Sequence, residues 1–167
     1  MSPDSGAGTG TDDGSAGGAD EPVATDGGAD PVEVAFVCVQ NAGRSQMATA
    51  FAERERERRG LEDDVVIHTG GTHPADHVHG VVVEAMAEDG IDLSDRTPRA
   101  VDTETLDGCD YVATMGCSTL ELDADVDVRD WALDDPDGQP MERVREIRAE
   151  VESNVRALFD EIEADLA

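Results

Sequence analysis

The feature that most constrains this chain is a strand, a short polar loop and a helix that follow one another directly from residue 32. The stretch "VEVAFV", residues 32–37, is apolar and rich in β-branched side chains apart from Glu33, as is typical of a buried strand. The next seven residues, "CVQNAGR", are small or polar. The stretch "SQMATAFAERERERR", residues 45–59, then has the apolar spacing of a helix and stops at Gly60. Strands that alternate with helices in this way favour a parallel sheet.

The alternation continues along the rest of the chain. We predict further strands at residues 64–69, 110–116 and 124–131, and helices at residues 76–90 and 141–166. The apolar residues of the last helix recur at intervals of three and four: Val144, Ile147, Val151, Val155, Leu158 and Ile162. The predicted fold is α/β, a single doubly wound domain with a four-stranded parallel sheet and helices on both faces. Sites in such sheets gather at the carboxyl ends of the strands, so Cys38, Cys117, Asp134 and Asp135 are expected at one edge.

The first thirty or so residues differ in composition from the rest. They are rich in Gly, Asp, Ala and Ser and contain almost no large apolar side chain. Such a segment buries too little surface to offset its ordering entropy, so we predict a disordered acidic tail at residues 1–31 and a folded domain at residues 32–167. No secretory signal is expected at this start, and no apolar run approaches the ~18 residues of a membrane span.

The charge balance excludes several partner classes. The chain has 40 acidic and 12 basic residues, all of the latter Arg, for a net charge of −28. This charge repels nucleic acid and anionic membranes, and its self-repulsion is screened in high salt, where the Debye length falls to ~3 Å at 1 M. The 3 cysteines are widely and unevenly spaced, which favours reduced thiols over a disulfide framework. We therefore predict a cytoplasmic protein of a salt-rich cell; an acidic surface for a basic partner is the alternative.

The polar loop has the properties of an oxyanion cradle. Between a strand and a helix, main-chain N–H groups and the positive end of the helix face the loop's centre. Arg44 can bind two oxygens at once, and Asn41 tolerates a left-handed backbone. The same field should hold Cys38 as a thiolate, with Ser45 capping the helix and donating its hydroxyl to the sulfur. The alternative is a buried structural Cys38 and a surface Arg44. The predicted oxyanion-binding residues are Val39, Gln40, Asn41, Ala42, Gly43, Arg44 and Ser45.

The stretch "NAGRSQMA" resembles the low-molecular-weight protein tyrosine phosphatase superfamily, and within it the arsenate reductases, which share "NxxRSQMA". The resemblance extends from Val34 to Leu158 and includes "YVATMGCSTLE" and "DWALDDPDG". It implies that Cys38 is the nucleophile, that Asn41 shapes the loop and that Arg44 binds the oxyanion. It also implies that Ser45 stabilises the thiolate and that Asp135, directly before Pro136, is the general acid. The alternative for Asp135 is an ordinary turn residue.

Two activities of this superfamily begin with thiolate attack on a tetrahedral oxyanion. Its tyrosine phosphatases usually follow Asp-Pro with aromatic residues that hold the substrate ring, whereas this chain has "DDPDGQP". They also usually have Pro where this chain has Gln46. Both differences favour arsenate reduction to arsenite. The alternatives are a phosphatase that hydrolyses phosphate monoesters, or a non-catalytic oxyanion-binding regulatory module.

A reductase needs a second thiol, and the resemblance places it at Cys117. The thioredoxin-coupled members carry another cysteine six to eight residues later, but here that stretch is "STLELDAD". Either Cys117 forms the disulfide with Cys38, or an external thiol attacks instead, of thioredoxin type or of low molecular weight. Cys117 as a buried strand-end thiol is the alternative, and Cys109 is predicted to be buried and inert.

No metal and no tightly bound cofactor are predicted. The metal-stabilised reductases usually have Glu where this chain has Thr49, so we expect no potassium site of their type. His73, His77 and His79 lie in a polar stretch without the spacing of a zinc site, and a solvated loop is the prediction.

Overall fold

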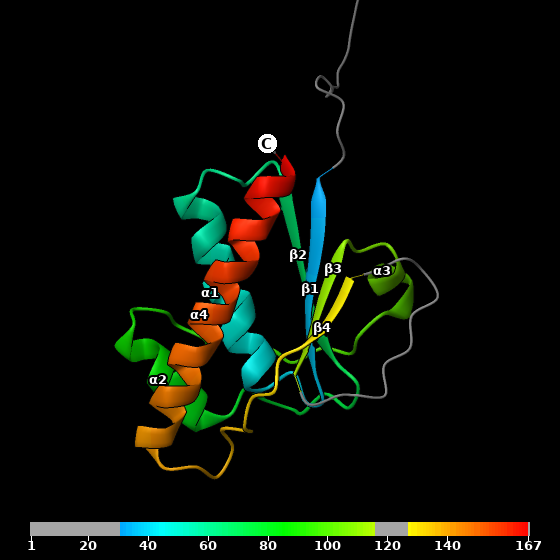
Figure 1. The fold of residues 1–167 in the computed structure, drawn as a ribbon. Helices are drawn as coiled ribbons and strands as arrows, with labels where there is room; N and C mark the ends of the chain where they lie inside the picture. Colours follow the sequence, from blue (N-terminus) through cyan, green and yellow to red (C-terminus); the bar gives the residue numbers. More distant parts are fainter. Residues whose placement is uncertain (1–30, 116–126, 167) are drawn as a thin grey trace, which may run out of the picture. The chain divides into compact units, whose positions relative to one another are not determined.

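A computed structural model describes residues 31–115 and 127–166, which are organised around a parallel sheet (Figure 1). Its strands are β1 (Val32–Cys38), β2 (Val65–Gly71), β3 (Tyr111–Met115) and β4 (Asp127–Asp130). They lie in the order β2-β1-β3-β4, and every neighbouring pair is parallel. The predicted four-stranded parallel sheet is confirmed. The disordered tail predicted at residues 1–31 falls almost wholly outside the described residues.

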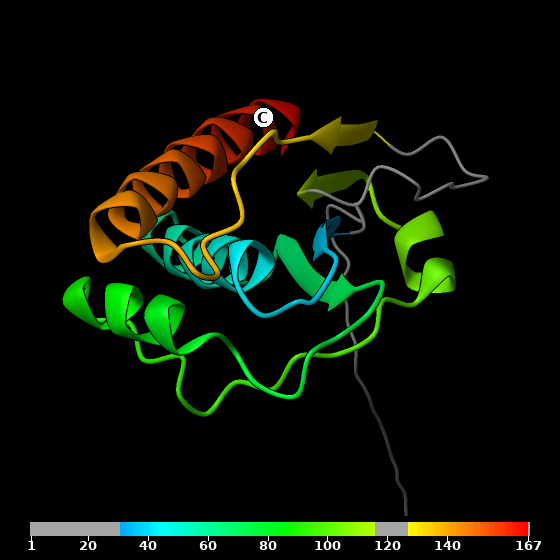
Figure 2. The same cartoon turned by 90° about the horizontal axis from the view of Figure 1, so that it is seen from below.

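Helices lie on both faces of the sheet, as predicted. Helices α1 (Arg44–Arg58), α2 (Gly80–Glu88) and α4 (Met141–Leu166) lie on one side, and α3 (Thr103–Asp107) lies on the other (Figure 2). The alternation of β1 explains this arrangement: Val34, Phe36 and Cys38 join the apolar cluster under α1 and α4, whereas Ala35 and Val37 join a smaller one with Leu106 of α3. Both faces of β1 are buried from Val34 to Cys38, which is why this part of its sequence is an unbroken apolar run.

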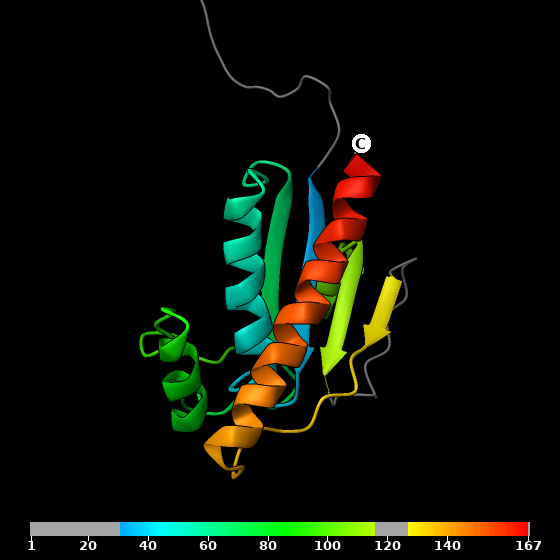
Figure 3. The same ribbon diagram turned by 60° about the vertical axis from the view of Figure 1, so that its left-hand side comes forward.

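Helix α4 follows its predicted pattern. Its bounds are those expected, and it lies beside α1 over the sheet (Figure 3). The six apolar residues predicted to face the core are at most 1% exposed: Val144, Ile147, Val151, Val155, Leu158 and Ile162. The N-terminal part of α4 contacts α2, where Arg145 and Arg148 hydrogen-bond Glu88. These bonds lower the pKa of the Glu88 carboxyl to about 2.

Gly60 and Gly90 were predicted to end the helices that precede them. Their φ angles are 67° and 77°, which glycine adopts at little cost.

Several predicted bounds were wrong. The helix expected at residues 76–90 begins only at Gly80, because the preceding chain bonds to the cradle: the N–H groups of His73, Ala75 and His79 donate to the carbonyls of residues 39, 40 and 42. Strand β2 reaches Gly71 rather than Thr69, since Gly71 pairs with Cys38. Helix α3 was not predicted; it is short and begins where Asp102 accepts a bond from the Glu104 N–H. Part of the strand predicted at residues 124–131 lies outside the described residues.

The sheet order places a crevice at the end of β1. Strand β2 lies on one side of β1 and β3 on the other, so the connections that follow β1 and β2 lead to opposite sides of it. In open α/β sheets ligands bind at such a switch point, beyond the carboxyl ends of the strands. Cys38 is the last residue of β1 and therefore lies at this point. Among the described helices, none combines the length and apolar character that a bilayer crossing requires.

Candidate active site

Cys38 is held in a polar setting although its side chain is only 2% exposed. Its Sγ lies 2.8 Å from Ser45 Oγ and accepts a bond of 3.2 Å from the Asn41 N–H. Both groups can donate to a thiolate, so the sulfur's surroundings suit a negative charge. The expected Ser45–Cys38 contact is present, but Ser45 does not cap the helix. The N-cap is Gly43, and Ser45 lies in the first turn with its hydroxyl directed to the sulfur.

Asn41 forms the rigid centre of the cradle. Its φ is 51°, as expected for an Asn in a left-handed turn, and it is fully buried. Its Nδ2 donates to Ser45 Oγ at 2.8 Å and to Thr69 Oγ1 at 2.9 Å. Its Oδ1 accepts from the Arg99 N–H at 3.0 Å and from Gln46 Nε2 at 3.1 Å. Every polar atom of this side chain is thus paired, which fixes the loop that surrounds Cys38.

Two groups of donors face the centre of this loop. The first N–H groups of α1 lack intrahelical acceptors, and no side chain caps them. The Arg44 side chain is 12% exposed; its Nη1 donates to the Leu133 carbonyl at 2.9 Å and its Nη2 lies 3.9 Å from Asp135 Oδ2. Its Nε is buried and has no acceptor among the described residues. An anion bound in the loop would satisfy these donors.

A pocket of about 190 Å³ brings the predicted residues together. It is lined by Cys38, Val39, Gln40, Gly43, Arg44, His79 and Asp135. Asn41, Ala42 and Ser45 are fully buried and support the cradle from behind. Cys117 lies outside the described residues. The arrangement therefore joins a thiol, a guanidinium, uncapped helix N–H groups and a carboxyl at one opening, a set suited to nucleophilic attack on a tetrahedral oxyanion.

Sequence reasoning missed His79 as a pocket residue. It was assigned to a solvated loop, yet its side chain is 17% exposed and its ring lines the pocket. Two contacts from distant parts of the chain place it there: its N–H donates to the Ala42 carbonyl at 2.8 Å, and its Nε2 lies 3.0 Å from Gln40 Oε1. Within the described residues, no group of three or more His, Cys, Asp or Glu side chains is arranged to hold a metal ion.

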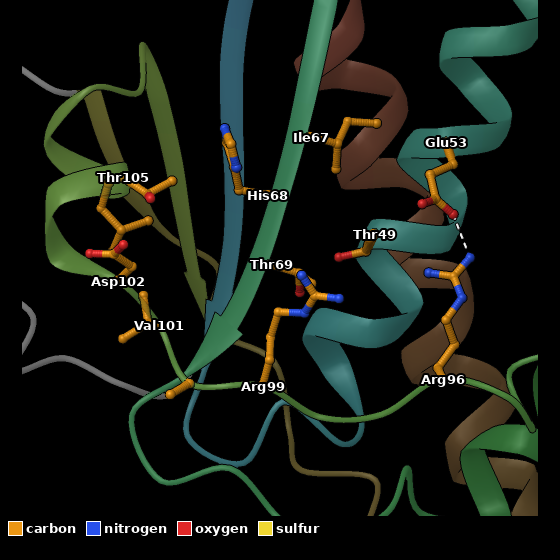
Figure 4. Close-up of a pocket in the computed structure, with 12 residues that line it drawn as sticks. Thr49, Glu53, Ile67, His68, Thr69, Arg96, Arg99, Val101, Asp102 and Thr105 are labelled. Atoms are coloured by element: carbon orange, nitrogen blue, oxygen red, sulfur yellow. Dashed lines mark hydrogen bonds and ion pairs between the residues drawn. The ribbon is translucent and has the colours of Figure 1, made fainter.

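A larger cavity of about 330 Å³ lies between α1, β2 and the chain that leads into α3 (Figure 4). Its lining includes Thr49, Thr69 and Arg99, and an ion pair of 2.5 Å joins Arg96 to Glu53 at its edge. Cys38 does not line it. Two of its lining residues support the cradle, because Thr69 accepts from Asn41 and Thr49 Oγ1 donates to the Ser45 carbonyl at 2.7 Å.

Cys109 is buried, as predicted, and lies in the smaller apolar cluster with Leu106. Its Sγ donates to the Thr105 carbonyl at 3.3 Å. Burial, together with the smaller effect of the charges of Glu33 and Asp110, raises the pKa of this thiol to about 12. Cys109 is therefore a neutral thiol at physiological pH, which is the unreactive form.

Known proteins with similar sequences and structures share this architecture. Residues 33–167 match the family described as low molecular weight phosphotyrosine protein phosphatase. A Halobacterium salinarum protein, provisionally named an arsenate reductase, is 75% identical over 131 residues, which cover 78% of this chain and 92% of that protein.

Two solved structures are also similar. A thioredoxin-dependent arsenate reductase of Corynebacterium glutamicum has a TM-score of 0.68 and 32% identity, and the match covers 82% of this chain and 65% of that one. An arsenate reductase in the phosphate binding state has a TM-score of 0.67 and 30% identity, covering 78% of this chain and 98% of that one.

Proposed function

This chain belongs to the low molecular weight phosphotyrosine protein phosphatase family, and within that family we propose that it reduces arsenate to arsenite. The observation that carries the choice of substrate is the lining of the pocket. Its seven residues include no Phe, Tyr or Trp. The imidazole of His79 is the one ring among them, so an aryl phosphate would lose the contact with Phe, Tyr or Trp that contributes ~0.5–1.5 kcal/mol to such a pair beyond area burial. A bare oxyanion needs only the donors that the cradle presents. The similarity to the Halobacterium protein supports the same choice.

The first step forms a bond between Cys38 Sγ and arsenic. Arsenate binds with its oxygens on the N–H groups of the cradle and on Arg44, and the Cys38 thiolate attacks the arsenic. Asp135 donates a proton to the departing oxygen, which leaves as water, and a thiol–arsenate adduct remains. Arsenic is still As(V) at this stage.

The second step is the reduction. A second thiolate attacks Cys38 Sγ, the S–As electron pair passes to arsenic, and arsenite leaves as As(III). The two sulfurs lose two electrons together and become a disulfide. A thiol reductant, of thioredoxin type or of low molecular weight, then restores both thiols. We place this chemistry in residues 32–167 and in the cytoplasm, where reduced thiols persist.

The proposed function is tested with the purified full-length chain in molar KCl, because the net charge of −28 needs screening. Arsenate is supplied with dithiothreitol or with a thioredoxin system, and arsenite is measured; aryl phosphate hydrolysis is measured in parallel. We expect arsenite formation that requires the thiol and exceeds aryl phosphate turnover at least tenfold. Brisk phosphate release without any arsenite would assign the pocket to a phosphatase.

We propose further that Cys117 supplies the second sulfur. Cys117→Ser is expected to lower thioredoxin-coupled arsenate turnover at least tenfold. The adduct on Cys38 can then be attacked only by an external thiol, which makes the second step slower. Mass spectrometry of the parent protein after one turnover without reductant should show a disulfide between Cys38 and Cys117. Cys109→Ser is the matched control and should turn over normally. Unchanged turnover in Cys117→Ser would assign the attack to the external thiol.

A further inference from the structure

We propose that the imidazole of His79 holds the acid loop, which we define as residues 133–137, against the oxyanion cradle. In this view His79 is a positioning residue that acts through Asp135 and does not touch the reacting atoms. The inference deepens the proposed function and rests on it for the role of Asp135. The sequence analysis had predicted that His79 lies in a solvated loop.

The two ring nitrogens of His79 face oxygen atoms on opposite sides. Nε2 lies 3.0 Å from Oε1 of Gln40, which belongs to the cradle. Nδ1 lies 3.8 Å from Oδ1 of Asp137, which belongs to the acid loop. A protonated ring donates to Gln40 at hydrogen-bond distance and attracts the Asp137 carboxylate across 3.8 Å, a separation of an ion pair and not of a hydrogen bond, whereas a neutral ring keeps only one N–H for either side.

Hydrogen bonds fix the main chain of His79 and thereby restrict where its ring can lie. Its N–H donates to the Ala42 carbonyl, and its own carbonyl accepts from the N–H groups of Val82 and Val83, each at 3.0 Å. His79 is the N-cap of α2, a position where Ser, Thr, Asp or Asn usually bonds the first-turn N–H groups. The His79 side chain makes no such capping bond. It is directed to the pocket instead.

The acid loop has a contact at each end, with Asp135 between them, and a further ion pair of 2.5 Å joins its Asp134 to Arg143. At one end Arg44 Nη1 donates to the Leu133 carbonyl at 2.9 Å. At the other end Asp137 faces His79, and the Asp137 N–H donates to Asp135 Oδ1 at 3.0 Å. A movement of Asp137 is therefore passed directly to the proposed acid. Charged groups at this junction include Arg44, Asp135 and Asp137, and the ion pair of Arg143 with Asp134 lies on the same loop.

Packing at Gly43 brings the same parts into contact. A Cβ placed on Gly43 would lie 3.0 Å from Pro136 Cγ and 3.4 Å from His79 Cδ2. The acid loop and the imidazole thus both rest on the backbone of the cradle at this residue. Phe in place of His79 would keep an aromatic ring in this position while removing both nitrogens.

The test compares His79→Phe with His77→Phe, a matched control in the same segment, since His77 is exposed and lines no described pocket. We expect His79→Phe to lower kcat for arsenate about tenfold, a fraction of the ~10²–10⁴-fold that general acid catalysis contributes. KM for arsenate, and the phosphate concentration that half-protects Cys38 from iodoacetate, should stay within twofold. His77→Phe should match the parent protein.

The background of Asp135→Asn separates positioning from a general structural role. With the acid removed there is nothing left for His79 to position, so His79→Phe should cause no further loss of kcat. A further tenfold loss in that background, or an unchanged kcat for His79→Phe in the parent background, would overturn the inference. His79→Gln, which can still donate one hydrogen bond, is expected to recover part of the lost kcat.

Hydrogen exchange gives a readout that does not depend on arsenate turnover. Residues 133–139 should exchange faster in His79→Phe than in the parent protein or in His77→Phe. If the parent protein forms no arsenite, the proposed function fails, while faster exchange would still support the tether between His79 and the acid loop. If arsenite forms and the exchange is unchanged, the tether fails and the proposed function stands.

Discussion

Cys38→Ser is expected to abolish arsenate reduction, with a loss of about 10⁴-fold or more, the scale seen when other enzymes lose a covalent nucleophile. The serine hydroxyl keeps the hydrogen bond to Ser45 Oγ but is a far weaker nucleophile than a thiolate at neutral pH. Without the S–As bond there is no electron pair for the second thiol to displace. The measurement is arsenite formation in molar salt with excess thiol reductant.

The same variant should keep the cradle. The donors of the loop and Arg44 are unchanged in Cys38→Ser, so phosphate should bind within about tenfold of the parent affinity, as measured by calorimetry. Retained binding with lost turnover separates the nucleophile from the cradle. Measurable arsenite formation by Cys38→Ser would show that the reacting sulfur lies elsewhere in the chain.

Cys109→Ser is the matched control for this experiment. Its hydroxyl can replace the thiol in donating to the Thr105 carbonyl, and the residue lies in the apolar cluster that includes Ala35 and Val37, whereas Cys38 packs in the cluster under α1 and α4. The raised pKa of the parent Cys109 thiol already excludes it as a nucleophile at neutral pH. We expect normal turnover, with folding checked by circular dichroism.

Some elements of the fold depend on the local sequence pattern alone, and these could be predicted. The apolar run of β1 and the three-and-four spacing of α4 depend on burial of their own side chains, and both elements appear nearly where expected. The left-handed turn at Asn41 is equally local, because few residues other than Gly tolerate a positive φ. The order of the strands is different. It depends on pairings between distant segments, for which the sequence carries no local signal.

The candidate site shows the same division. Cys38, Asn41 and Ser45 lie within one loop and the helical turn that follows it. Their contacts could therefore be predicted from neighbouring residues in the sequence. His79 lies 39 residues from Gln40, and only the folded chain brings the two side chains together. The start of α2 was misplaced for a related reason: carbonyls of the cradle accept from N–H groups that an isolated segment would pair within its own helix.

Arg44→Lys is expected to lower kcat/KM for arsenate by about 10–10²-fold, because the loss of a hydrogen bond to a charged group costs ~1.5–3 kcal/mol. Lysine keeps the charge but has no planar fork. The Arg44 guanidinium donates to the Leu133 carbonyl and still presents a buried Nε without an acceptor, and an ammonium group cannot serve both directions at once. We therefore expect most of the loss in KM, with a smaller loss in kcat.

Protection of Cys38 from iodoacetate by phosphate shows whether the Arg44→Lys substitution weakens binding of the oxyanion. In Arg44→Lys the phosphate concentration that half-protects Cys38 should rise at least tenfold, while the alkylation rate without phosphate changes little because the charge is retained. Arg145→Lys is the matched control. Arg145 bonds Glu88 of α2 at 2.8 Å on the exposed surface and away from the pocket, so the same substitution there keeps a weakly coupled ion pair and should change kcat/KM less than twofold. An Arg44→Lys protein with parental KM and phosphate protection would show that the guanidinium does not bind the oxyanion, and the uncapped N–H groups of α1 alone would have to hold the substrate.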